Sequence, residues 1–171
     1  MHFELAPPAG VGPLQIGMTR QAANHALESL REPTAISASD RAGQHIFRPS
    51  GLMISIACTR DLLEAVELGR PSQRSGIVLF RGIDVFGLPA RDVVSRMAEV
   101  TTIVAAEDDP ASFIAPDLLL SFWRPFQGED DPEDEQGYFF NSVLLARPGY
   151  YDGPSTPVGV LRMSWSAAWW R

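Results

Sequence analysis

Apolar residues recur at helical spacing in two stretches of the chain. They are Ala23, Leu27 and Leu30 in the first stretch and, 70 residues later, Val93, Met97 and Val100 in the second. Positions i, i+4 and i+7 share one face of a helix, so this spacing predicts amphipathic helices over Arg20 to Arg31 and over Pro89 to Glu99. Thr19 is suited to cap the first helix with its side-chain oxygen. Pro89 fits a first helical turn, where its missing N–H costs nothing.

Extended segments follow each predicted helix. Leu52 to Ile56 aligns with Leu118 to Phe122 at an offset of 66 residues, and Val66 to Pro71 aligns with Val143 to Pro148 at an offset of 77. These segments are rich in Leu, Ile, Val and Phe and adjoin turn residues, which is typical of β-strands. The sequence therefore predicts a helix and then an antiparallel meander, twice.

The self-alignment predicts a tandem duplication. We expect a first α+β unit at 1–76, a second α+β unit at 77–150, and an aromatic C-terminal segment at 151–171 that packs on the core. Phe3 to Leu5 and Ile77 to Val85 add an extended segment ahead of each helix. The expected fold class is α+β, with two tandem helix-plus-antiparallel-meander units whose helices pack on one face of the sheet or sheets.

The change of offset from 66 to 77 locates an insertion of eleven residues in the second unit, at 127–137. It holds six carboxylates, which are the predicted partner-binding residues: Glu129, Asp130, Asp131, Glu133, Asp134 and Glu135. Mutual repulsion and Pro132 predict an extended, mobile hairpin tip. A calcium loop of the EF-hand type is disfavoured, because the glycines lie at the ends of the run and its flanks are predicted strands.

Charge narrows the class of partner. The net charge is -7, and all of the excess is in residues 77 to 171, which carry seven Arg and fourteen acidic residues, while residues 1 to 76 carry seven of each. The chain has no lysine and no basic cluster, which disfavours nucleic acid as a partner. A basic protein is favoured instead.

The C-terminal segment is unusually aromatic. Trp165, Trp169 and Trp170 lie within the last seven residues. We expect them to complete the core, as terminal aromatic residues commonly do. The alternative is that they are exposed and act as aromatic anchors in an interface, where Trp is over-represented.

No local pattern of catalytic or metal-binding residues is present. The histidines His2, His25 and His45 are dispersed, and Cys58 shares the spacing of apolar strand residues, so we predict no catalytic residue, no metal and no cofactor. The N-terminus has no signal-peptide pattern, no apolar run is long enough to cross a bilayer, and a single cysteine fits a reducing compartment. The sequence therefore predicts a cytoplasmic protein without a membrane partner.

The stretch Gly12-Pro13-Leu14-Gln15-Ile16-Gly17-Met18-Thr19-Arg20 resembles the helix opening of the SmpA/BamE lipoprotein family. It is also similar to the duplicated fold of β-lactamase inhibitor protein, and to bacterial proteins with a Gly-Pro-Leu-x-x-Gly-Met-Ser/Thr start. The resemblance implies a tandem α+β fold and binding to a protein. The chain lacks the lipid-attachment cysteine and the disulfides of these families, so their envelope role and their binding residues are not transferred.

These observations favour a non-catalytic protein-binding module, such as an immunity protein or an inhibitor of a basic toxin or enzyme. One alternative is an enzyme or small-ligand binder that uses a cleft between the two units. Another is a self-associating structural protein, for which a homodimer is possible.

Overall fold

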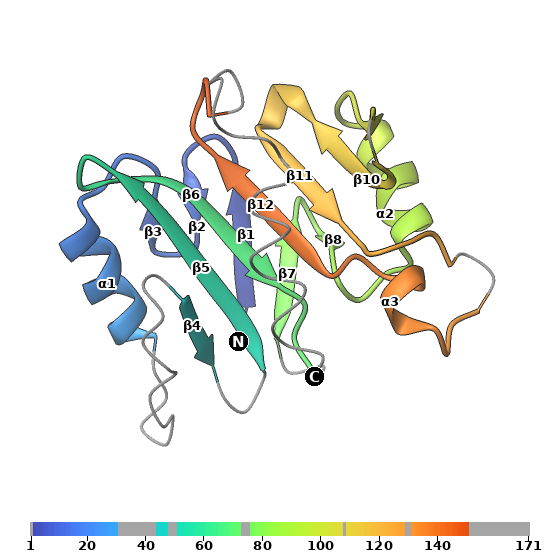
Figure 1. Cartoon of the computed structure of the whole chain (residues 1–171), viewed down its shortest axis with the longest axis horizontal. Helices are drawn as coiled ribbons and strands as arrows, with labels where there is room; N and C mark the ends of the chain where they lie inside the picture. Colours follow the sequence, from blue (N-terminus) through green and yellow to red (C-terminus); the bar gives the residue numbers. More distant parts are fainter. Residues whose placement is uncertain are drawn as a thin grey trace.

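The computed structural model describes residues 2–30, 44–47, 51–72, 76–107, 109–128 and 131–150, with residues 44–47 as backbone. The fold is built mainly from two β-sheets (Figure 1). The seven-stranded sheet contains β4 (Gln44–Phe47), β5 (Leu52–Thr59), β6 (Leu62–Gly69), β9 (Val104–Ala106), β10 (Asp109–Ala115), β11 (Leu120–Trp123) and β12 (Ser142–Ala146). The five-stranded sheet contains β1 (His2–Ala6), β2 (Gly10–Val11), β3 (Leu14–Gln15), β7 (Ile77–Phe80) and β8 (Ile83–Asp84). The helices are α1 (Arg20–Ser29), α2 (Ala90–Ala98), α3 (Glu135–Tyr138) and the 3-10 helix η1 (Pro116–Leu118).

The large sheet has the strand order β4-β5-β6-β12-β11-β10-β9, and all of its neighbours are antiparallel. At its centre, Val66 of β6 lies opposite Ile56 of β5 on one side and opposite Leu145 of β12 on the other. Alternate residues of these strands are apolar and buried, which is the period expected when one strand face meets the core.

The small sheet has the order β3-β2-β1-β7-β8 and lies behind the large sheet in Figure 1. Its β1–β7 pair is parallel, with His2 opposite Ile77. Phe3 and Leu5 of β1 are buried in one core cluster with residues of the large sheet, while His2, Glu4 and Ala6 are exposed. The small sheet therefore has one face in the core and one face in water.

The expected α+β fold, with helices packed on one face of the meanders, is wrong, because the structure is mostly β-sheet with few short helices. Helix α1 contributes Ala23 and Leu27 to the core, and Val100, predicted on the second apolar stripe, is 46% exposed and lies beyond the end of α2. A helix of about ten residues is roughly 15 Å long, whereas seven strands span roughly 30 Å. The second sheet supplies the missing layer, and α1 and α2 flank it at β3 and β8 (Figure 1).

The segments that align within the sequence occupy related places in the large sheet. Strands β6 and β12 form its central pair, and β5 and β11 lie on their outer sides. The division into units at 1–76 and 77–150 stays a prediction. The structure does show that both parts of the chain contribute strands to both sheets, and that these strands share one core.

The Gly-Pro-Leu-x-x-Gly-Met-Thr stretch has a local structural explanation. Leu14 is fully buried. Gly17 has a φ of +88° and donates its N–H to the Leu63 carbonyl at 2.8 Å. The Met18 carbonyl in turn accepts the Leu63 N–H at 2.8 Å. Thr19 caps α1 as predicted, because its Oγ1 accepts the Ala22 N–H at 3.2 Å. The stretch therefore attaches the start of α1 to β6.

We expect Gly17→Ala to lower the free energy of unfolding by about 1–2 kcal/mol, because left-handed backbone is costly for a residue with a Cβ. A Cβ at this position would meet no atom within 4 Å, so the cost is conformational and not steric. Gly17→Asn is the matched control and should lose less, since Asn tolerates this region. Urea unfolding of the three proteins measures the difference, and an equal loss in both variants would contradict the explanation.

Candidate functional site

The acidic insertion, residues 127–137, lies in the segment of the chain between β11 and β12. Its described carboxylates, Asp131, Glu133, Asp134 and Glu135, are all exposed. Glu129 and Asp130 lie outside the described residues. The insertion therefore presents at least four carboxylates to solvent within five consecutive residues.

A buried arginine holds the base of the insertion. Arg124, directly after β11, is only 1% exposed. Its Nη1 donates to the Gly137 carbonyl at 2.7 Å and its Nε donates to the Ala111 carbonyl at 3.3 Å. Gly128 N–H also donates to the Gly137 carbonyl, at 3.0 Å, so the two ends of the insertion meet over Arg124.

Gly137 is required sterically at this closure, and Gly128 is closely packed against it. A Cβ on Gly137 would collide with the Phe126 ring and with the backbone of Gly128. These glycines lie at the two ends of the acidic run in the sequence. Because they lack a Cβ, the backbone at Gly128 can approach the backbone at Gly137 closely.

The tip of the insertion is a turn followed by a short helix, and not the extended segment that charge repulsion predicted. The Asp131 carboxylate accepts the Glu133 N–H at 2.9 Å, and the Asp131 carbonyl accepts the Asp134 N–H at 3.1 Å. Such local bonds from Asp side chains stabilise turns. They offset part of the repulsion among the carboxylates.

Glu135 forms an ion pair with an arginine next to the large sheet. Its Oε2 lies 3.1 Å from Nη1 of Arg70, which follows β6, and the Arg70 guanidinium lies 4.1 Å from the centre of the Phe139 ring. Exposed pairs of this kind contribute up to about 1 kcal/mol. Within the described part of the chain, Asp131, Glu133 and Asp134 make no ion pair.

A second polar group lies on the face of the large sheet that points away from the core. Glu67 of β6 is mostly buried, and burial raises the pKa of its carboxyl, while a hydrogen bond with Ser142 of β12 acts in the opposite direction. Ser55 of β5 lies opposite Glu67 in the strand register and is 6% exposed. Its hydroxyl is buried without a hydrogen-bond partner. This group was not predicted from the sequence, although the Glu between Val66 and Leu68 indicated a polar position on the opposite face of the strand.

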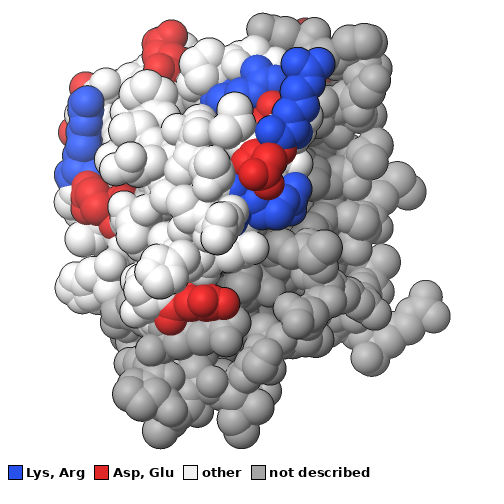
Figure 2. Space-filling model, turned by 90° about the vertical axis from the view of Figure 1, so that its left-hand side faces the viewer, with Lys and Arg blue, Asp and Glu red and all other residues white. Residues whose placement is uncertain are grey.

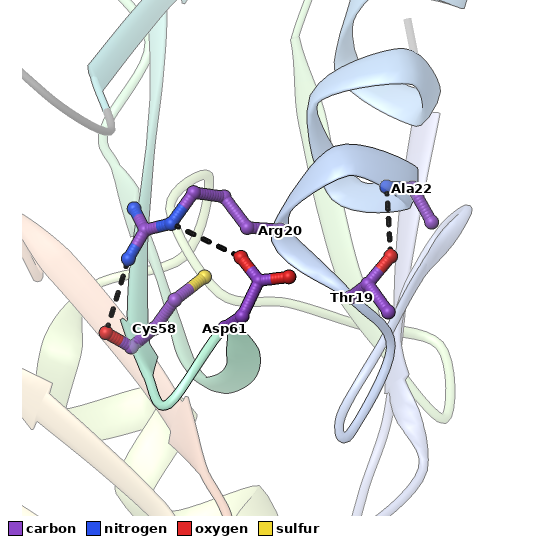
Figure 3. A network of polar contacts seen from close by, with 5 residues as sticks. All are labelled: Thr19, Arg20, Ala22, Cys58 and Asp61. Atoms are coloured by element: carbon purple, nitrogen blue, oxygen red, sulfur yellow. Dashed lines mark hydrogen bonds and ion pairs between the residues drawn. The ribbon is translucent and has the colours of Figure 1, made fainter.

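A third group joins α1 to the β5–β6 hairpin (Figure 3). Arg20 Nη2 donates to the Cys58 carbonyl at 3.2 Å, and Arg20 Nε lies 3.7 Å from Oδ1 of Asp61. Burial raises the pKa of the Cys58 thiol, and the nearby Arg20 opposes this shift. A thiol with a raised pKa is a poor nucleophile. The contacts of Arg20 with the Cys58 carbonyl and with Asp61 attach α1 to the hairpin.

The remaining candidate positions lie elsewhere on the described elements or outside the described residues. His2 and His25 are exposed, on β1 and α1, and His45 lies on β4. Trp165, Trp169 and Trp170 lie outside the described residues. In the described part of the chain, no three His, Cys, Asp or Glu side chains gather where they could hold a metal ion. On the face shown in Figure 2, some groups mix basic and acidic side chains, other acidic side chains stand alone, and uncharged surface lies between them.

We expect Arg124→Ala to lower the free energy of unfolding by about 3 kcal/mol, because the Ala111 and Gly137 carbonyls lose charged donors in a buried place. Hydrogen exchange of the amides at 131–138 should accelerate as well. Arg70→Ala is the control, since it removes an arginine that contacts the same insertion from a more exposed position after β6, and it should cost about 1 kcal/mol. Similar losses in the two variants would contradict the anchoring role of Arg124.

The raised pKa of Glu67 predicts a pH-dependent stability. The folded chain binds the proton more tightly than the unfolded chain, so stability falls as pH rises from the ordinary carboxyl value of 4.5 to the higher folded pKa. Glu67→Gln carries no charge and should escape this loss. Its Tm should therefore exceed that of the wild type by more at about pH 7.5 than at about pH 4. Thermal unfolding tests this, with the exposed Glu28→Gln as control, and a difference that is the same at both pH values would refute it.

Comparisons with known proteins add no relative from which a function follows. No protein-family model, no curated protein and no solved structure matches this chain. Within the residues that the structure describes, no helix has the length and apolar character to cross a membrane.

Proposed function

We propose that this chain is a protein-binding module whose acidic insertion contacts a basic protein. The observation that supports this most directly is a run of exposed carboxylates on a segment whose base is closed by the buried Arg124. An exposed acidic loop alone is common on protein surfaces. An acidic loop anchored by a buried arginine is a more costly arrangement, because the guanidinium has to be taken out of water.

The anchoring favours binding because it lowers the cost of association. A free loop loses conformational entropy when it docks, at about 0.5–1.5 kcal/mol for each side chain that becomes immobile. Here the hydrogen bonds at Gly128, Asp131 and Gly137 order the backbone before any partner arrives. The exposed carboxylates of Glu133 and Asp134 therefore stand next to each other on an ordered segment of backbone.

The distribution of charge supports the same partner. The chain carries a net charge of -7, all of it in residues 77 to 171, and its field would attract a basic protein and repel acidic ones. Complementary charge of this kind raises association rates and is weakened by salt. An immunity protein or an inhibitor of a basic toxin or enzyme in the cytoplasm is the specific role that we propose within this class.

We expect the intact chain to capture a basic protein from lysate at about 50 mM salt and to release it at about 500 mM salt. Neutralising three insertion carboxylates, with Glu133→Gln, Asp134→Asn and Glu135→Gln, should slow association with the captured protein roughly tenfold. Asp131 is left intact because its side chain stabilises the turn. Association rates from surface-immobilised partner measure the effect.

The matched control neutralises three exposed carboxylates outside the insertion, with Glu28→Gln, Glu99→Gln and Asp117→Asn. It changes the net charge by the same amount and should slow association much less. If both triple variants behave alike, total charge drives the encounter and the insertion is not the contact surface. A captured partner that stays bound in high salt would contradict the electrostatic proposal.

A further inference from the structure

Strand β9 forms one edge of the large sheet. Among the described strands, β10 is its only neighbour. In an antiparallel ladder, alternate residues turn their N–H and C=O groups toward one neighbour, so the residues between them turn these groups outward. Within the described part of the chain, the backbone of residues 102–105 makes no hydrogen bond apart from those of the β9–β10 ladder. The outer edge of β9 therefore offers main-chain donors and acceptors to an added strand.

The sequence of this edge favours pairing. Residues 100–106 read Val-Thr-Thr-Ile-Val-Ala-Ala, with five β-branched residues and no charge, Pro or Gly. Sheet edges are commonly protected by Lys, by Pro or by a bulge, but here the bulge falls on β10, where residues 110–112 have no partner in the register. Ile103 packs against the core, whereas Val104 is 49% exposed and Val100 is 46% exposed. An added strand would therefore also cover apolar surface.

The charges around the edge select the kind of strand that it can accept. Residues 99–109 contain four acidic residues and no basic one. Glu99 and Glu107, which border the uncharged stretch, are both exposed. A second copy of the chain would bring the same acidic residues to the same edge, and like charges that face each other are unfavourable. A strand with an uncharged centre and basic ends has the complementary charge.

The edge ends next to the base of the acidic insertion. Ala106, at the end of β9, lies opposite Asp109 of β10. The carbonyl of the next residue, Pro110, accepts a hydrogen bond from Nε2 of Gln127 at 2.9 Å, and Gln127 is the first residue of the insertion. In Figure 1, β10 and α3 lie in the same right-hand half of the molecule. One partner segment can therefore contact both the edge and the insertion.

Strand addition at β9 alone is a small contact. The strand has three residues, so its outer edge offers few main-chain hydrogen bonds. Specific protein interfaces bury roughly 1,200–2,000 Å² in total, so a partner needs a second contact surface. An extended segment of about ten residues spans roughly 33 Å, which is long enough to pair with β9 and to continue toward the insertion. The edge would then fix the register of the segment, and the insertion would add area and charge.

We propose that β9 binds an extended segment of the partner protein by strand addition, and that this segment has an uncharged, β-prone centre between arginine or lysine residues. Main-chain hydrogen bonds to β9 hold the centre of the segment. Glu107 and the acidic insertion attract its basic residues. The inference rests on the proposed function for the basic character of the partner, and it adds the way in which that partner is held.

Peptide selection on the full chain tests the proposal with a defined probe. Random peptides of about ten residues are displayed and selected at about 50 mM salt, and the most enriched one is synthesised. It should carry β-branched or apolar residues at its centre and basic residues at its ends. At saturation it should slow hydrogen exchange of the outward amides within 102–106 at least roughly tenfold. The amides of β8, an edge strand of the small sheet, are the control and should not change.

N-methylation of the selected peptide tests the main-chain hydrogen bonds directly. One version is methylated at its odd-numbered central amides and the other at its even-numbered ones. Only alternate N–H groups of an added strand face the neighbouring strand, so one version should bind at least roughly tenfold more weakly and the other should bind like the parent peptide. Equal binding by the two versions would contradict strand addition.

A substitution on the edge provides the matching test in the chain itself. Val104→Lys should weaken peptide binding roughly tenfold, because a lysine on an edge strand obstructs pairing and repels the basic ends of the peptide. Leu62→Lys adds the same charge at another exposed apolar position and should leave binding nearly unchanged. Circular dichroism checks that both variants are folded, and an equal loss in the two would contradict binding at β9.

The outcomes separate this inference from the proposed function. Protection of the insertion with none at β9 would overturn strand addition and leave the basic partner in place. Protection of β9 by a peptide without basic residues, unaffected by Glu133→Gln, Asp134→Asn and Glu135→Gln together, would support strand addition and contradict the basic partner.

Two further results would overturn the inference. The first is a selection in which no enriched peptide protects β9. The second is protection of β9 that rises with protein concentration in the absence of peptide, which would assign the edge to a second copy of the chain.

Discussion

The fold depends on the antiparallel pairing of β6 with β12. Residues Ala65 to Gly69 lie opposite Ser142 to Ala146 over five consecutive positions, and these strands join segments about 77 residues apart in the sequence. Without this pair, the large sheet would separate into β4-β5-β6 and β12-β11-β10-β9. Its inner side chains, Val66, Leu68, Val143 and Leu145, are at most 1% exposed, so the same pair is also the centre of the core.

The position of the acidic insertion follows from this pairing. Asn141, directly before β12, donates its N–H to the Trp123 carbonyl at 2.7 Å and accepts the Arg70 N–H at 2.8 Å. These bonds join the end of the insertion to the ends of β6 and β11. Arg124 also donates a hydrogen bond to the Gly137 carbonyl. A surface loop is thus connected to the sheet through ordered backbone. The connection orders the backbone at the base of the insertion, while its described carboxylates remain exposed to solvent.

Much of the local structure could be predicted from the sequence, and the fold class could not. Helix α1, its Thr19 cap and strand β5 follow from spacing and composition over a few residues. The parallel β1–β7 pair joins His2 to Ile77, and a local pattern does not say which distant strand an extended segment will join. Periodicity therefore predicts the extended segments but not the second sheet that they form. The burial of Arg124, between Trp123 and Pro125, was equally invisible, because an isolated arginine is usually a surface residue.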